Sequence, residues 1–218
     1  MRLRRLAQTP AVWSLRFRRN FLLWWGSGGG ILLRAVPIYH RVYAPGELQF
    51  LTSSTYRRVP VFLSDRLRRC FVERLEEVRQ ELNFQLVGWV LMPEHFHLLL
   101  RPEPAETTPL IMKELKEESA KRILRTLRAN AQHPWCRKML TSLRLPCTVH
   151  DESHYRLWQR RFYPFNVFSE KKFQEKLDYM HYNPVERRLV SSPCGWPWSS
   201  WRFYYWEDAS ILRMDRLR

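Results

Sequence analysis

Residues 84–100 read Phe-Gln-Leu-Val-Gly-Trp-Val-Leu-Met-Pro-Glu-His-Phe-His-Leu-Leu-Leu. Two apolar runs, 84–91 and 96–100, are separated by Met-Pro-Glu. Because proline has no N–H to donate to a sheet ladder, Pro93 marks a turn, and the two runs are predicted to form a β-hairpin. His95 and His97 then project from one face of the second strand, since side chains alternate along a strand.

The sequence before this hairpin predicts one strand and one helix. Residues 48–55 follow a Pro-Gly turn and are rich in β-forming side chains, which predicts a strand. Ser64 and Asp65 offer an N-cap for a helix of about five turns. Its apolar residues recur at steps of three or four: Leu67, Phe71, Leu75, Val78 and Leu82.

The sequence after the hairpin predicts two further helices and one strand. A helix begins at Thr108-Pro109, because proline is tolerated in a first turn. Residues 130–154 have little periodicity and are predicted to be a loop, whereas residues 155–163, aromatic and basic together, indicate a strand. A third helix begins at Ser169 and is expected to stop at Asn183-Pro184. The order β-α-β-β-α-β-α predicts an α+β fold, with helices on an antiparallel sheet of about four to five strands.

The chain of 218 residues is long enough for one domain with appendages, and it is strongly basic. Lysine and arginine number 37 against 21 acidic residues, a net charge of +16, and 45% of the residues are hydrophobic. This apolar content excludes a disordered chain, and the charge favours a nucleic acid as partner over an anionic membrane surface. Four cysteines without a Cys-x-x-Cys pair argue against a disulfide scaffold or a thiolate zinc site and fit a cytoplasmic protein.

Residues 1–34 differ from the rest, with seven arginines, no acidic residue and an apolar run broken by glycines. This run is too short for a membrane span and lacks the cleavage site of a signal peptide. We interpret residues 1–36 as an extension, either poorly ordered or translated from a start codon upstream of the functional one. A basic arm that contacts phosphates is the alternative. Residues 37–206 are predicted to form a single domain, followed by a tail at 207–218.

Two local patterns carry candidate chemistry. His95 and His97 on one strand face could clamp a divalent metal, although two half-buried histidines without a ligand are slightly more common. On the third helix, Tyr179 and Asn183 are four residues apart and share a face, whereas Tyr182 points elsewhere. A tyrosine can act as a covalent nucleophile when a metal or base activates its phenol. The alternatives are a tyrosine packed in the core and an asparagine that only ends the helix.

Three motifs together resemble one family. Residues 92–100 (Met-Pro-Glu-His-Phe-His-Leu-Leu-Leu), 179–185 (Tyr-Met-His-Tyr-Asn-Pro-Val) and 196–200 (Trp-Pro-Trp-Ser-Ser) closely resemble the IS200-like single-tyrosine (Y1) transposases. The branch they resemble most is that of the REP-associated tyrosine transposases (RAYTs). The likeness covers roughly residues 46–205 and includes three further segments, 51–58, 86–93 and 157–163.

The resemblance implies a His-hydrophobe-His (HUH) endonuclease on an antiparallel sheet similar to an RNA-recognition motif (RRM) or ferredoxin-like fold. In that family the residues matching His95 and His97 bind a divalent ion, Mg²⁺ or Mn²⁺, and a polar residue matching Asn183 completes the metal shell. The residue matching Tyr179 attacks single-stranded DNA and becomes linked to the 5′-phosphate, leaving a free 3′-OH. Glu94 is a candidate further ligand or base, although a glutamate beside a turn is more often solvated.

The resemblance also implies that the substrate is single-stranded, hairpin-forming DNA, bound by a nucleoid-associated protein without a membrane partner. Candidate DNA contacts combine charge with stacking faces, although each lysine among them fits a solvated helix face equally well. These candidates are Lys113, Lys116, Lys121, Arg125, Arg156, Trp158, Arg160 and Arg161. Two alternatives stay open: a nucleic-acid-binding protein without catalysis, and a domesticated relative that nicks DNA but no longer transposes. The sequence does not choose between a monomer and a homodimer.

Overall fold

A four-stranded antiparallel sheet organises the computed structural model, which describes residues 46–103, 107–146, 154–209 and 211–216. The sheet is open, with strand order β2-β3-β1-β4. Its strands are β1 (Leu48–Ser54), β2 (Gln85–Met92), β3 (His95–Arg101) and β4 (Tyr163–Val167). The predicted α+β fold with an antiparallel sheet is therefore confirmed. The extension predicted at residues 1–36 lies outside the described residues.

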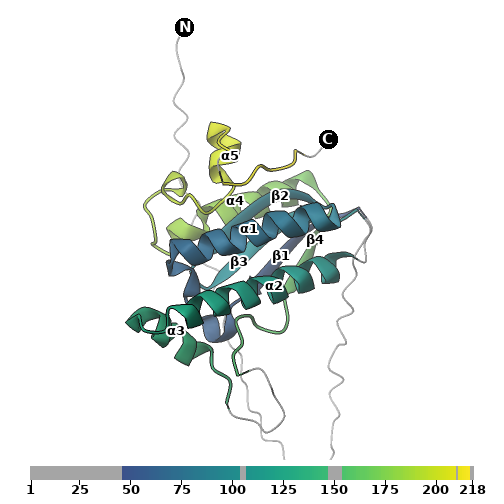
Figure 1. The fold of residues 1–218 in the computed structure, drawn as a ribbon. Coiled ribbons are helices and arrows are strands. Elements are labelled where there is room, and N and C mark those ends of the chain that lie inside the picture. Colours follow the sequence, from purple (N-terminus) through teal and green to yellow (C-terminus); the bar gives the residue numbers. More distant parts are fainter. Residues whose placement is uncertain (1–45, 104–106, 147–153, 210, 217–218) are drawn as a thin grey trace, which may run out of the picture. The chain divides into compact units, whose positions relative to one another are not determined.

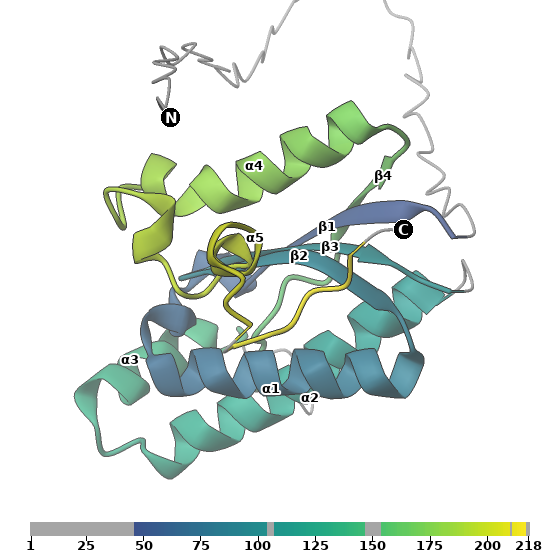
Figure 2. The same cartoon turned by 90° about the horizontal axis from the view of Figure 1, so that it is seen from above.

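Helices cover both faces of this sheet (Figures 1 and 2). On one face, α1 (Asp65–Leu82) packs against α2 (Thr107–Ala129), whereas α4 (Glu170–Glu186) crosses the opposite face (Figure 2). α3 (Pro134–Leu143) packs against α2, and the short helix α5 (Trp201–Trp206) follows α4 in the chain. The sheet thus separates a layer containing α1 and α2 from a layer containing α4.

The side chains of β3 are divided between these two layers. Phe96 packs against Phe71 of α1 with ring centroids 4.9 Å apart, so the two histidines that flank it in the strand face α4. On the neighbouring strand, Gly88 allows α4 to approach closely, because a Cβ at this position would lie 2.8 Å from the Met180 side chain. The hairpin is therefore built to present a histidine pair to the helix above it.

Residues 130–154 are not the loop that their weak periodicity predicted, because they contain α3. Pro134 stands in the first turn of this helix, where its missing N–H costs nothing. The preceding His133 caps the helix: its Nδ1 accepts a hydrogen bond from the Trp135 amide at 3.3 Å. The helix is short and buries only three apolar side chains, too few for a clear periodic pattern: Met139, Leu140 and Leu143.

The strand predicted at residues 155–163 is also wrong, since only Tyr163 at its end belongs to a strand. Tyr155 and Trp158 form isolated bridges, to Arg144 and Thr55 respectively. Consecutive residues Leu157 and Trp158 are both buried, which a regular half-buried strand does not allow. The segment is instead an irregular strip that runs along α2 before β4 begins.

Helix α4 does not stop at Asn183-Pro184 as expected, but runs to Glu186. Proline disrupts a helix by removing one N–H and crowding the carbonyl four residues earlier. Since Pro184 stands two residues from the end of α4, few bonds depend on the turn it disturbs. This extension keeps Asn183 within the helix, on the face that meets the sheet.

The part of the C-terminal tail that the structure describes borders β2. The Asp215 amide donates a hydrogen bond to the Leu86 carbonyl at 2.8 Å, and the Leu86 amide donates one to Asp215 Oδ2 at 2.8 Å. Leu212 and Met214 are buried. Among the described residues, no helix combines the length and apolar character that a membrane span requires.

Candidate active site and basic groove

The two histidines of β3 lie together beneath α4. Their ring centroids are 4.9 Å apart, and each side chain is buried, with 4% of its surface exposed. Phe50 of β1 stacks on the His97 ring at 5.1 Å and forms one wall of the site. The alternation of β3, together with burial under α4, therefore produces the pair that the sequence pattern predicted.

Both imidazoles are held through Nδ1. Glu94 Oε1 accepts a hydrogen bond from His95 Nδ1 at 3.1 Å, and His97 Nδ1 shares a hydrogen bond with Thr52 Oγ1 at 2.7 Å. This arrangement leaves Nε2 of each ring to meet a further partner. Burial, with the nearby His95 and Lys176 charges, holds the pKa of His97 well below its usual value of 6.5. His97 is therefore neutral at pH 7 and keeps a lone pair for a ligand.

Helix α4 brings an amide and a phenol to this pair. Asn183 Nδ2 donates a hydrogen bond to His97 Nε2 at 3.3 Å, whereas Asn183 Oδ1 is buried without a hydrogen-bond partner. The Tyr179 ring lies 5.3 Å from the His97 ring, one helical turn before Asn183. Tyr182 is on another face of α4 and is 51% exposed. The tyrosine chosen from the sequence, Tyr179, is thus the one that contacts the histidines.

The Tyr179 phenol is partly buried and 43% of the side chain remains exposed. Burial raises its pKa above the usual 10, and the Glu186 carboxylate raises it further. The phenol is therefore protonated at neutral pH, and as a nucleophile it would need an activating charge nearby.

Glu94 is an ordered part of the site and not a solvated turn residue. Its side chain is 18% exposed, and Oε1 accepts hydrogen bonds from both His95 Nδ1 and Arg58 Nη2, the latter at 3.0 Å. The hydrogen bond from His95, helped by the Arg58 charge, lowers the pKa of Glu94 to about 2 in spite of burial. The carboxylate is thus ionised at every working pH and orients the His95 ring.

The segment that follows α4 fastens this helix to the sheet. Ser200 Oγ accepts a hydrogen bond from the Trp89 amide at 3.1 Å and shares another with His181 Nε2 at 2.9 Å. Trp196 Nε1 donates to the Leu91 carbonyl at 3.1 Å, and its indole is buried. The Trp-Pro-Trp-Ser-Ser motif therefore has a positional role, because it links β2 to the helix that carries Tyr179.

A divalent cation fits the donors present, although no three His, Cys, Asp or Glu side chains in the described part of the chain form a metal cluster. The set combines two imidazoles with an amide, which are ordinary metal ligands. The unpartnered Asn183 Oδ1 is a buried acceptor beside His97, and rotation of the amide would exchange its nitrogen for this oxygen. Glu94 and Thr52 meanwhile provide the outer hydrogen bonds that metal-binding histidines use.

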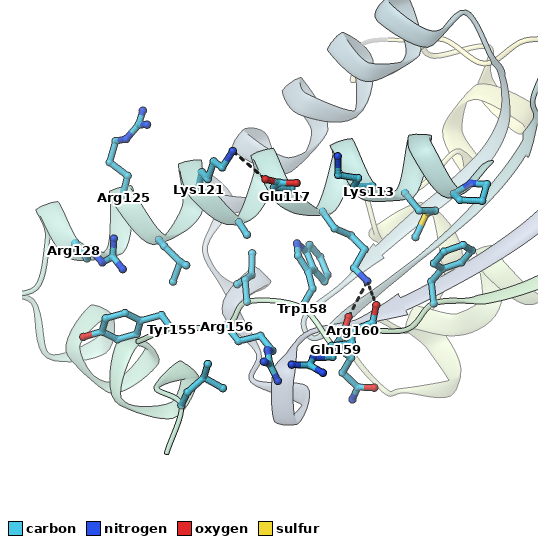
Figure 3. Close-up of a pocket in the computed structure, with 18 of the residues that line it drawn as sticks. Lys113, Glu117, Lys121, Arg125, Arg128, Tyr155, Arg156, Trp158, Gln159 and Arg160 are labelled. Atoms are coloured by element: carbon cyan, nitrogen blue, oxygen red, sulfur yellow. Dashed lines mark hydrogen bonds and ion pairs between the residues drawn. The ribbon is translucent and has the colours of Figure 1, made fainter. Parts of the chain in front are cut away.

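A basic groove of about 1210 Å³ lies on the opposite face of the sheet, between α2 and residues 155–162 (Figure 3). Seven cationic residues and one glutamate line it: Lys113, Lys116, Lys121, Arg125, Arg128, Arg156, Arg160 and Glu117. Figure 3 shows the α2 side chains Lys113, Lys121 and Arg125 along one wall and Arg156 and Arg160 along the other. Six of the eight predicted DNA contacts are therefore cations of one groove.

Two predicted DNA contacts are placed differently. Trp158 is 5% exposed: its indole packs on Phe62 and Phe71, and its Nε1 donates a hydrogen bond to Ser119 Oγ at 3.1 Å. Trp158 also lines the groove, but its ring belongs to the core and exposes little surface for stacking on a base. Arg161 is exposed but is not among the residues that line the groove. Sequence reasoning missed Arg128, whose guanidinium lies over the Tyr155 ring at 4.9 Å.

The lysines of the groove differ in how far neighbouring groups already engage their charges. Lys116 Nζ donates hydrogen bonds to the Gln159 and Arg160 carbonyls at 2.8 and 3.0 Å, so it joins the two walls. Lys121 Nζ lies 2.6 Å from Glu118 and 3.3 Å from Glu117, which offsets its charge. Lys113 is 3.6 Å from Glu114 with its side chain 66% exposed. We therefore expect unequal contributions from these lysines to binding an anion.

Comparison with known proteins finds relatives of one kind. The model of the family described as "Transposase IS200 like" matches residues 47–153. A Haemophilus influenzae protein named as a REP-associated tyrosine transposase is 26% identical over 166 residues, covering 74% of this chain and 84% of that protein. The REP-associated tyrosine transposase of Escherichia coli K12 is 22% identical over 166 residues, covering 74% and 81%.

A solved structure of a REP-associated tyrosine transposase bound to a REP hairpin is similar in fold. It has a TM-score of 0.56 and 18% sequence identity to this chain, over 83% of this chain and 90% of that one. The fold and the family match agree on one class of protein: residues 47–153 match the IS200-like transposases, and the chain shares the fold of a solved transposase of their REP-associated branch. The two curated relatives are named as REP-associated tyrosine transposases, the branch that the sequence motifs resemble.

Proposed function

We propose that the protein is a metal-dependent, HUH-type enzyme that cuts and rejoins single-stranded, hairpin-forming DNA through a 5′-phosphotyrosine. The observation that carries this proposal is the meeting of Tyr179 and Asn183 from α4 with His97 from β3. A phenol, an amide and two imidazoles from distant segments lie together between β3 and α4, which core packing alone does not require. Nucleophile and metal ligands are thus arranged as covalent phosphodiester chemistry needs.

His95, His97 and Asn183 would hold the cation, Mg²⁺ or Mn²⁺. Such a cation, when bound, supplies positive charge that offsets the negative charge developing on the scissile phosphate. Neutral ligands leave that charge undiminished, and the low pKa of His97 keeps its imidazole neutral. Glu94 and Thr52 fix the ring orientations through Nδ1 and so leave Nε2 of each ring to meet the cation.

Tyr179 would supply the nucleophile. Its Oη forms a bond to phosphorus while the bond from phosphorus to the 3′-oxygen breaks, and that oxygen leaves as a 3′-OH after taking a proton. The phenol loses its own proton as the new bond forms, because its raised pKa keeps it protonated beforehand. Since the phosphotyrosine conserves the phosphodiester bond, a 3′-OH can later attack it and rejoin the strand without ATP.

The basic groove would hold the hairpin. Its cations lie along both walls over the length of α2, as a phosphate backbone requires. The solved REP-associated relative is bound to a REP hairpin, and this chain shares its fold. We therefore infer that hairpin DNA, and not an unstructured strand, is the substrate that the groove selects.

The test is a covalent-adduct assay on hairpin-forming single strands taken from inverted repeats near the gene. The DNA is labelled at its 3′ end, because a 5′-phosphotyrosine keeps the 3′ portion on the protein. We expect a labelled protein band on denaturing gels with Mn²⁺ or Mg²⁺, and none with EDTA. Tyr179→Phe should abolish the band, and Tyr182→Phe, as the matched control, should keep it.

Two results would refute the proposal. One is the absence of an adduct with either metal on all the hairpins, together with retained binding, which would identify a nucleic-acid-binding protein without catalysis. The other is an adduct that persists in Tyr179→Phe, which would assign the nucleophile to another residue.

A further inference from the structure

The 3₁₀ turn η1 (Tyr56–Arg58) connects the groove to the histidine site. On the groove side, the Tyr56 amide donates a hydrogen bond to the Leu157 carbonyl at 2.7 Å. On the site side, the amide of Thr55, just before the turn, donates to the Glu94 carbonyl at 2.9 Å. The turn begins where β1 ends, and the last residue of β1, Ser54, pairs with His95. It therefore lies at the end of the sheet where the histidine pair begins.

Two consecutive arginines of this turn, Arg57 and Arg58, have a strained backbone conformation. Arg57 and Arg58 have φ angles of 52° and 55°, in the left-handed region that residues with a Cβ rarely occupy. The Arg58 amide donates to the Thr55 carbonyl at 3.0 Å, and the Val59 amide donates to the Tyr56 carbonyl at 3.1 Å. Two consecutive residues of this kind cost free energy, and such strain concentrates at functional sites.

The two side chains continue the line of groove cations toward the histidines. The Arg156 guanidinium, in the groove wall, lies 5.6 Å from the Tyr56 ring centroid, and the Arg57 guanidinium lies 5.0 Å from the same centroid. Arg58 reaches Glu94, the carboxylate that holds His95, and its side chain is still 51% exposed. Three guanidinium groups thus extend from the groove to the edge of the histidine site.

This arrangement matters because the groove and the histidines lie on opposite faces of the sheet, as the positions of α2 and α4 in Figure 2 make clear. A DNA strand that leaves the groove must pass around the sheet to reach Tyr179. The end of the sheet at η1 offers a short route with guanidinium groups along it, and guanidinium is well suited to bind phosphate.

We propose that the Tyr56–Arg58 turn guides the single strand from the hairpin groove to the histidine site, with Arg57 and Arg58 binding its phosphates. This inference rests on the proposed function, because it takes hairpin DNA with a single-stranded flank as the substrate. When the strand enters, the Arg58 guanidinium leaves its ion pair with Glu94 and binds a phosphate of the strand instead. Glu94 keeps its hydrogen bond from His95, so the histidine site is preserved during the exchange.

The test separates binding of the flank from binding of the hairpin. One labelled hairpin is prepared bare and with single-stranded flanks of about ten nucleotides on both ends. Fluorescence anisotropy gives the affinity of each DNA for the full chain in EDTA, from about 50 to 200 mM salt. The variants are Arg57→Gln, Arg58→Gln and Arg58→Lys, and Arg66→Gln serves as the matched control, since Arg66 is an exposed arginine of α1 outside the groove.

We expect Arg57→Gln and Arg58→Gln each to weaken binding of the flanked hairpin about three- to tenfold. Each should reduce the salt slope of the flanked hairpin by about 0.7, as loss of one single-strand phosphate contact predicts. The bare hairpin should bind as it does to the wild type. Arg58→Lys keeps the charge and should restore most of the slope, and Arg66→Gln should change neither DNA.

Arg57 forms no ion pair with any residue that the structure describes, so Arg57→Gln also controls for a purely structural effect of losing the Arg58–Glu94 contact. The strand path is overturned if both glutamine variants bind the flanked hairpin as the wild type does, or if they weaken the bare hairpin equally. These results are distinct from failure of the proposed function. If the glutamine variants reduce the salt slope only for the flanked hairpin but no Tyr179 adduct forms, the proposed cleavage is refuted and the strand path is not. If the adduct forms but the variants leave the salt slopes unchanged, the strand path is refuted and the cleavage is not.

Discussion

Two buried imidazoles make the stability of this protein sensitive to pH. Burial lowers the pKa of His181 to about 4, and burial with nearby charges holds that of His97 well below 6.5. In the unfolded chain both groups return to about 6.5 and bind protons at a higher pH than in the folded state. Their contribution to stability is therefore complete above about pH 6.5 and is lost progressively as the pH falls toward 4.

We predict that the free energy of unfolding, measured by urea titration in EDTA, decreases between about pH 7.5 and pH 5. His181 alone should account for about 2 kcal/mol, and His97 should add to it in the same direction. Glu94, whose pKa is lowered to about 2, contributes nothing to this change, because its stabilisation is lost only below its ordinary value of 4.5. In His181→Gln the amide can still bond Ser200, so the pH dependence should shrink while the protein stays folded. An unchanged pH dependence in this variant would contradict the prediction.

Single residues of the active site differ in how far the sequence could predict them. His95, His97 and Tyr179 could be chosen because strand alternation and helical spacing place them on definite faces. The link from Arg58 to Glu94 could not, since it arises when antiparallel pairing sets the end of β1 opposite the start of β3. A contact between residues 36 positions apart leaves no periodic signal in the chain.

At the level of elements, the position of α4 decides whether Tyr179 reaches the histidines. Gly88 is the point of closest approach: a Cβ there would lie 2.8 Å from Met180 Cε and 3.1 Å from Leu177 Cδ1. We predict that Gly88→Ala destabilises the protein by about 1 kcal/mol, at the low end for overpacking, because the ends of the flexible Met180 and Leu177 side chains must shift to make room. It should also lower the yield of the Tyr179 adduct more than it lowers binding of the hairpin.

Urea denaturation and the adduct assay on the same preparations measure both effects of Gly88→Ala. Gly195→Ala is the matched control, since a Cβ at this position would meet only Val190, at 3.4 Å. If the two alanine variants have the same stability and the same adduct yield, the close packing of α4 on β2 does not limit formation of the adduct.

The elements that sequence patterns predicted and those they missed differ in one physical respect. α1 buries a regular stripe of side chains against the sheet, and its 3.6-residue period is visible in the sequence. The segment 155–162 is fixed by contacts with residues far away in the chain: Trp158 packs on Phe62, Phe71 and Phe96. Tertiary packing of this kind overrides local strand propensity, which is why an aromatic and basic segment was predicted as a strand.

On the scale of the whole molecule, positive charge is placed where the two DNA regions would bind. The net charge of +16 is far larger than solubility requires, and seven cations line one groove beside a single glutamate. The histidine site on the other face holds two imidazoles and an amide, with Glu94 and Arg58 paired at its edge. Under the proposed function, this arrangement separates affinity for the phosphate backbone from the chemistry at one phosphate.

This separation predicts the salt dependence of hairpin binding. Each groove cation that neutralises a duplex phosphate contributes about 0.9 to the slope of log affinity against log salt. We predict that Lys113→Gln and Arg125→Gln each reduce the slope for the bare hairpin by about that amount, whatever the loop sequence. Lys121→Gln should reduce it less, because Glu118 and Glu117 already offset the Lys121 charge.

Anisotropy titrations of the bare hairpin over the same salt range measure these slopes, with Arg66→Gln as the control that removes one charge outside the groove. A loss as large in Arg66→Gln as in Arg125→Gln would mean that the protein attracts DNA through its overall charge and not through the groove. Equal losses in Lys113→Gln and Lys121→Gln would mean that the acidic neighbours of Lys121 do not hold its charge in solution. The phosphate backbone lies between α2 and residues 155–162 only if the slope falls more in Lys113→Gln and Arg125→Gln than in Lys121→Gln, and does not fall as much in Arg66→Gln.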